Sequence, residues 1–126
     1  MNSLAAAALA AGELICEFSD GSLFFEALKH EAAQVLSTRQ PGRHEVEVHR
    51  TTEYLHFIQR DGASVRVTTL TGCTRSRWRG EEQVCTRFAA RHAWHFDTAA
   101  HLDPDASFRR QPSGAASGSC EPWKLE

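Results

Sequence analysis

The chain has 126 residues, of which 41% are hydrophobic and 24% charged, and its formal net charge is −2. This length predicts one domain over residues 1–126, and the composition is that of an ordinary globular protein. The small negative charge gives the chain no overall attraction to nucleic acid or other polyanions. No run reaches the roughly 18 apolar residues of a spanning helix, so we expect no membrane span.

The first residues, MNSLAAAALAAG (1–12), allow two interpretations. The apolar run from Leu4 to Ala11 contains a small-x-small triplet at Ala8-Leu9-Ala10, as a signal remnant would, but no positively charged start precedes it. Alanine and leucine are also strong helix formers. The same residues therefore predict either a signal remnant or an N-terminal helix.

The next two segments differ in the spacing of their apolar residues. Alternation over 13–21 predicts a short strand that ends in a turn at Asp20-Gly21. Over 22–39, apolar residues recur at three-and-four spacing, Ser22 can cap the start, and Pro41-Gly42 follows the end. We therefore expect a helix over 22–39, with the alternative that Phe24-Phe25 begin a strand.

The middle of the chain predicts strands. Residues 44–49 alternate, and residues 52–70 form a hairpin around Asp61-Gly62 that places Ile58 opposite Val65. Tyr54 and His56 then lie on one side of this hairpin, whereas Leu55, Phe57, Arg66 and Thr68 lie on the other.

The C-terminal part predicts one long strand and then irregular chain. Alternation over 83–96 places His92 and Trp94 on its apolar face. Residues 97–106 are expected to be a loop, 107–111 a short strand and 112–119 a flexible segment. The fold class predicted is α+β, with an N-terminal helix or helices packed on a curved, mainly antiparallel β-sheet.

Four cysteines, Cys16, Cys73, Cys85 and Cys120, allow three disulfide pairings. None has the C-x2-C spacing of a zinc knuckle, so no metal site is expected. If the strands over 65–71 and 83–90 are neighbours, a Cys73–Cys85 bond can close the hairpin, worth about 3 kcal/mol. Cys16 and Cys120 would then join the first strand to the C-terminal segment. The alternative is four free thiols in a cytosolic protein. Disulfides favour a periplasmic or secreted location over the cytoplasm.

The stretch CTRSRWRG (73–80) combines three arginines with Trp78. Such a combination can contact phosphates and stack on bases. Arginines at a hairpin tip are more often only solvated, however, and Glu81-Glu82 follow directly. Nucleic-acid binding is therefore not expected.

The seven histidines form no HExxH motif, and the chain contains no phosphate loop, dinucleotide fingerprint or serine nucleophile elbow. If the two apolar faces meet, Tyr54, His56, His92 and Trp94 would line a pocket. The simpler alternative is that these side chains fill the core. A histidine acting as general base would need a carboxylate, for which Asp97 and Asp20 are the candidates.

Four stretches, LICEFSDG, YLHFIQRDGASVRVTTL, RFAARHAWHF and GAASGSCEPW, carry one resemblance. In this order they resemble the layout of small exported proteobacterial proteins of unknown function. Those proteins have a Cys-x-Phe first strand, a hydrophobic hairpin ending in Thr-Thr, an Arg-His strand and a late cysteine. The resemblance implies export but no particular activity.

A second resemblance is architectural. A helix followed by long strands, joined by RDGA and RWRGEEQ turns, is similar to the cone of the nuclear-transport-factor-2-like (SnoaL/ketosteroid-isomerase-like) superfamily. EEQVCTRFAARHAWHF would be the long penultimate strand. The superfamily contains isomerases, cyclases and dehydratases as well as binding modules.

The sequence thus predicts a small non-catalytic module. It would bind a small apolar ligand or a protein partner through Tyr54, His56, His92 and Trp94, without a cofactor, and a homodimer is compatible with it. The alternative is a cone-shaped enzyme that uses a pocket histidine as general base on a small hydrophobic substrate.

Overall fold

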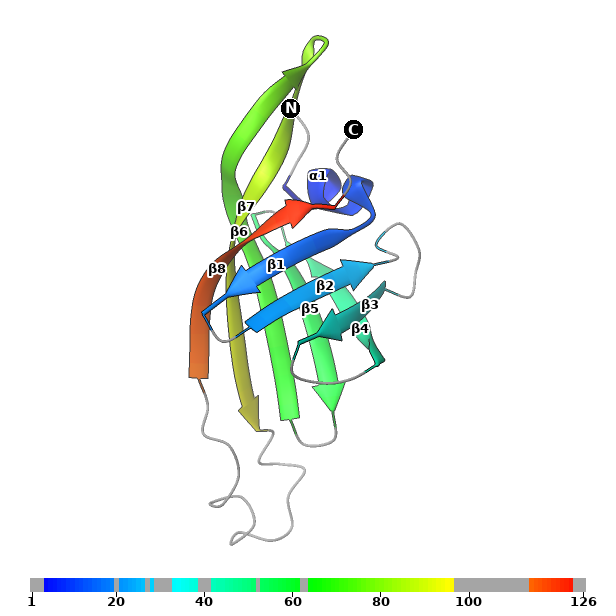
Figure 1. Ribbon diagram of the computed structural model, residues 1–126, viewed down its shortest axis with the longest axis vertical. Coiled ribbons are helices and arrows are strands. Elements are labelled where there is room, and N and C mark those ends of the chain that lie inside the picture. The colour runs from blue at the N-terminus through cyan, green and yellow to red at the C-terminus, as the bar shows by residue number, and fades with distance from the viewer. Residues whose placement is uncertain are drawn as a thin grey trace, which may run out of the picture.

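The computed structural model describes residues 4–19, 21–26, 28, 33–38, 42–51, 53–61, 64–96 and 114–123. One helix, α1 (Leu4–Ala11), precedes eight strands. The strands are β1 (Leu14–Phe18), β2 (Gly21–Glu26), β3 (Ala33–Ser37), β4 (Arg43–Arg50), β5 (Leu55–Asp61), β6 (Ser64–Arg79), β7 (Glu82–Phe96) and β8 (Gly114–Pro122). Each strand pairs antiparallel with the next, and β8 pairs with β1, so the sheet closes into a barrel (Figure 1).

The prediction of an α+β fold is wrong, because the described chain is nearly all β and its sheet is closed. Only α1 is helical among the described residues, at the N-terminal stretch for which a helix was one of the two interpretations. The cone-like architecture with helices packed on an open sheet therefore gains no support from the structure.

The predicted helix over 22–39 is wrong in the part that the structure describes. Strands β2 and β3 stand there instead. Phe25 pairs with Leu14 and with Val35, and these side chains are buried on the inner face of the barrel. Phe24 points to the outer face, where its ring lies edge-on to Trp123. Because apolar partners cover both faces of β2, the alternation that marks a strand is hidden.

The C-terminal prediction also needs correction. The segment expected to be flexible over 112–119 is, from Gly114 onward, strand β8, which pairs with both β7 and β1. The short strand expected over 107–111 lies outside the described residues. Gly114 and Gly118 sit on β8 because their neighbours leave no space for a side chain. A Cβ on Gly118 would lie 2.0 Å from the Glu17 carbonyl oxygen.

The β5–β6 hairpin has the predicted faces but another register. Its last pair is Asp61 with Ser64, and Ile58 pairs with Val67 rather than Val65. A shift of two residues returns every side chain to the same face, because side chains alternate with a period of two. Leu55 and Phe57 are therefore on one face, as predicted, and this face is the inside of the barrel.

Both predicted disulfides are confirmed. Cys16–Cys120 joins β1 to β8 with the two Cα atoms 4.0 Å apart, and it lies fully buried where the barrel closes. Cys73–Cys85 joins β6 to β7 with the two Cα atoms 6.0 Å apart. The described cysteines therefore include no free thiol.

Candidate functional site at the polar end of the barrel

The two ends of the barrel differ in the chemistry of their inner faces. At the end covered by α1, the inner side chains are apolar and fully buried: Leu14, Phe25, Leu55, Leu70 and Phe88. Ala8 of α1 packs into the same cluster, and Figure 1 shows α1 at this end of the barrel. We call it the helix end.

Toward the opposite end, the inner positions become polar. The strand register places Gln59, Arg66, Thr68, His92 and Trp94 on the inner face, where Thr68 pairs with His92 and Arg66 pairs with both Gln59 and Trp94. Facing residues of paired strands share a face, so these five side chains line one region. We call it the polar end.

A buried hydrogen bond lies at the centre of the polar end. The Thr68 hydroxyl and the His92 Nδ1 atom are 2.8 Å apart, and the two residues are only 2% and 4% exposed. The His92 ring also lies close to two other aromatic rings, with centroid distances of 5.4 Å to Phe18 of β1 and 5.8 Å to Trp94. The imidazole is thus held in one orientation by contacts on several sides.

Arg66 supplies the positive charge of the polar end. It is half-buried, and within the described chain it makes neither an ion pair nor a hydrogen bond through its side chain. Gln59, its neighbour across the strands, is 6% exposed. An inner-face guanidinium without an acidic partner favours an anionic group nearby, since arginine presents several donors in a planar fork.

The Trp94 indole depends on a glycine of the neighbouring strand. Trp94 pairs with Gly114, where an added Cβ would lie 2.4 Å from an indole carbon. The indole thus packs directly over the Gly114 backbone. A residue with a side chain at position 114 would displace it.

The structure separates the four residues predicted to line a pocket. His92 and Trp94 lie together on the inner face, as described above. Tyr54 precedes β5 and is 40% exposed, and His56 points outward, where its Nδ1 atom lies 2.9 Å from the Thr69 hydroxyl. Tyr54 and His56 lie side by side on the outer surface, with ring centroids 6.2 Å apart.

Three residues of the polar end, Gln59, Arg66 and Thr68, were not among the predicted site residues. Arg66 and Thr68 were placed correctly on the face opposite His56, but that face was not expected to contain His92. The sequence did not show which face of the hairpin lies on the same side of the sheet as the apolar face of β7. The apolar residues Ile58, Val65 and Val67 on the outer face make the inside and outside of this hairpin hard to distinguish.

One cluster of charged side chains lies on the outside of the barrel. Glu47 is exposed on β4 and contacts His49 at 3.2 Å and Arg60 at 3.3 Å. The hydrogen bond from His49, followed by the charge of Arg60, lowers the pKa of the Glu47 carboxyl below its ordinary value. This cluster is a surface feature and does not belong to the polar end.

The described residues contain no group of three histidine, cysteine or acidic side chains arranged to hold a metal ion. Among these same residues, no helix has the length and apolar character required to cross a membrane. Asp20 and Asp97, the candidate carboxylate partners of a histidine base, lie outside the described residues.

Comparison of the chain with protein-family models, with curated proteins and with solved structures found no match. The fold and the site therefore define this protein only as a disulfide-linked, eight-stranded antiparallel barrel with a polar cluster on its inner face. Its function has to be argued from that cluster.

Proposed function

We propose that the protein is an exported binding module that holds a small, largely apolar molecule with an anionic group inside its barrel. Barrels of eight strands either fill their interior with side chains or hold one small ligand there. Two disulfides fit an oxidising compartment, which supports export.

The proposal rests on the change from apolar to polar side chains along the inner face of the barrel. The helix end is a packed cluster of buried apolar side chains, which the apolar part of a ligand at the polar end would face. The polar end offers the Arg66 guanidinium, which forms no ion pair with any described residue, beside the Trp94 indole; this suits an anionic group next to an aromatic or aliphatic body. Ligand sites commonly combine a mainly apolar lining with a few polar groups placed in this way.

The described contacts of His92 hold its ring in place at the polar end. Its Nδ1 atom bonds to the neutral Thr68 hydroxyl, and two aromatic rings lie close to the imidazole. These contacts suit a fixed wall of a binding site.

Titration with 1-anilinonaphthalene-8-sulfonate, an aromatic probe with one anionic group, tests the proposal. We expect saturable binding at one site and fluorescence enhancement in the oxidised protein. Arg66→Gln should weaken binding at least about tenfold, because a hydrogen bond to a charged group contributes about 1.5–3 kcal/mol. Thermal unfolding of the variant confirms that it is folded.

Arg91→Gln is the matched control. Arg91 lies on β7 but is exposed on the outer face, and its loss changes the net charge equally. The control should bind the probe as the wild type does. Equal weakening in both variants, or no saturable binding by the wild type, would contradict the proposal.

A further inference from the structure

The β6–β7 hairpin extends well beyond the barrel. The pairing of β6 with β5 ends at Leu70, and the pairing of β7 with β8 ends at Phe88, so within the described chain residues 71–87 pair with no strand other than β6 or β7. We call this two-stranded ribbon the arm. Figure 1 shows it projecting past α1. Every residue from position 73 to 83 is exposed.

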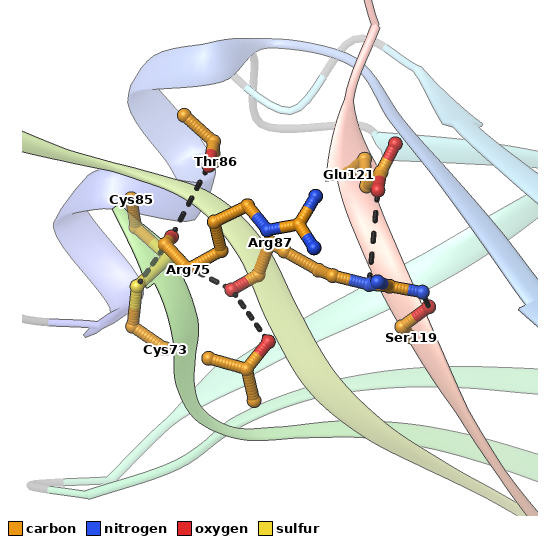
Figure 2. Close-up of polar contacts among 8 residues, drawn as sticks. Cys73, Arg75, Cys85, Thr86, Arg87, Ser119 and Glu121 are labelled. Atoms are coloured by element: carbon orange, nitrogen blue, oxygen red, sulfur yellow. Dashed lines mark hydrogen bonds and ion pairs between the residues drawn. A yellow bond between two sulfur atoms is a disulfide. The ribbon is translucent and has the colours of Figure 1, made fainter. Parts of the chain in front are cut away.

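Covalent and polar contacts hold the arm together at its base. The Cys73–Cys85 disulfide links its two strands, and the Thr86 hydroxyl donates to the Arg75 carbonyl oxygen at 3.3 Å (Figure 2). An isolated two-stranded hairpin is marginally stable in water. These contacts therefore maintain a ribbon that would otherwise fray.

Further contacts tie the arm to the barrel wall. The Arg87 guanidinium donates to the Ser119 hydroxyl at 3.2 Å and lies 3.7 Å from the Glu121 carboxylate, both on β8 (Figure 2). Within the arm, the Thr74 hydroxyl donates to the carbonyl oxygen of this same Arg87 at 3.3 Å. The arm therefore projects from the barrel in a defined direction.

The surface of the arm is basic and carries one large aromatic side chain. Arg75, Arg77 and Arg79 alternate along β6, Arg77 and Arg79 share one side beyond a register shift next to Arg75, and Trp78 between them is 69% exposed. Arg75 and Arg79 make no ion pair with any described residue. The arm contains four arginines and two glutamates, whereas the rest of the chain contains 10 basic and 14 acidic residues. A positive arm thus stands on an acidic body.

We propose that the arm docks the protein on an anionic lipid membrane surface. Tryptophan is enriched where membranes meet water, because its ring is apolar and its N–H is polar. Basic residues near an anionic leaflet each strengthen binding about fivefold. The acidic body would be repelled by the same surface, so only the arm would approach it. A narrow ribbon with one indole lacks the basic groove and the series of stacking rings that bind single-stranded nucleic acid.

Vesicle binding of the oxidised full-length protein tests this proposal, which is independent of what the barrel holds. Vesicles would contain phosphatidylcholine with or without about one quarter phosphatidylglycerol, at about 0.1 M salt. Only the anionic vesicles should co-sediment with the protein. Arg75→Gln with Arg79→Gln should weaken this binding roughly 30-fold, by about fivefold for each arginine.

The matched control is Arg50→Gln with Arg91→Gln, which removes two exposed arginines from the barrel wall. This control should bind anionic vesicles within about twofold of the wild type, since neither arginine belongs to the arm. Equal loss in the two double variants would overturn the proposal. So would failure of the wild type to bind the anionic vesicles.

Tryptophan emission separates membrane docking from binding to a soluble acidic polymer. Anionic vesicles should shift the emission to shorter wavelength, and Trp78→Phe should abolish this shift while Trp123→Phe leaves it. A shift that survives Trp78→Phe contradicts insertion of the arm. Binding to soluble polyglutamate as tight as to vesicles, without a shift, would identify an acidic protein partner instead and overturn the membrane proposal.

Discussion

Two neighbouring threonines make similar hydrogen bonds on opposite faces of the barrel wall. Thr68 points inward and bonds to buried His92 at 2.8 Å, while Thr69 points outward and bonds to His56 at 2.9 Å. The bond lengths are similar, but the first bond is buried and the second only partly buried. A buried polar group that loses its partner costs about 1–3 kcal/mol, whereas an exposed one can bond to water instead.

We therefore expect Thr68→Val to lower the free energy of unfolding by about 1–3 kcal/mol and Thr69→Val by less than about 1 kcal/mol. Valine keeps the shape and the β-branching of threonine, so packing and strand preference change little. Urea denaturation of both variants measures the difference. Equal losses, or a larger loss in Thr69→Val, would mean that the inner and outer faces are assigned wrongly.

Two glycines explain why the last strand was mistaken for flexible chain. The stretch GAASGS is rich in small residues, and such composition is typical of linkers. In the barrel these small residues are required, because Gly114 underlies the Trp94 indole and Gly118 abuts the Glu17 backbone. The small side chains serve long-range packing, which composition alone does not reveal.

At the scale of elements, local pattern was a good guide wherever one face of a strand is buried. From Phe88 to Trp94 the predicted apolar face of the long strand lies inside, and the 55–70 hairpin has its predicted sides. The pattern failed for 22–39, because Phe24 and Phe25 are covered on opposite faces. The spacing of the apolar residues in this segment then resembles that of a helix, although tertiary contacts make it a strand.

The two disulfides should contribute unequally to stability. They join residues 104 and 12 positions apart, respectively. Chain entropy gives roughly 4.7 kcal/mol for a loop of about 100 residues and about 3 kcal/mol for a short one. Cys16→Ala with Cys120→Ala should therefore lower the free energy of unfolding by about 1–2 kcal/mol more than Cys73→Ala with Cys85→Ala.

Guanidinium denaturation without reductant measures both double variants. Cys16 and Cys120 are fully buried, whereas Cys73 is exposed at the base of the arm, and loss of packing adds to the difference. Equal stabilities, or a larger loss from the arm pair, would show that closure between β1 and β8 does not depend on the buried disulfide.

At the scale of the whole molecule, the cysteines contained the one sequence signal for closure. A bond between Cys16 and Cys120 was predicted to join the first strand to the C-terminal segment, and these segments are indeed neighbouring strands. Combined with the antiparallel hairpins, that pairing predicts a closed sheet. Because residues 112–119 were interpreted as flexible, the last strand needed to complete the barrel was missing.

Closure also determines the site. Within a closed sheet, each side chain faces either the interior or the outside, and a pocket can use only one set. Of the four candidate residues, His92 and Trp94 face the interior and can line a pocket there. Tyr54 and His56 lie on the outside and cannot. Neither the strand period nor the hairpin turn identifies the inner face before the neighbours of each strand are known.

The central claim, that the polar end binds an anionic and largely apolar molecule, is tested most directly by the indole N–H signals of the ¹⁵N-labelled protein. The chain has three tryptophans, which Trp→Phe variants assign. Trp94 lies on the inner face, while Trp78 and Trp123 are 69% and 44% exposed. On titration with 1-anilinonaphthalene-8-sulfonate, we predict a saturable shift of the Trp94 signal and unchanged Trp78 and Trp123 signals. Shifts confined to Trp78 or Trp123, or no shift at all, would contradict the claim.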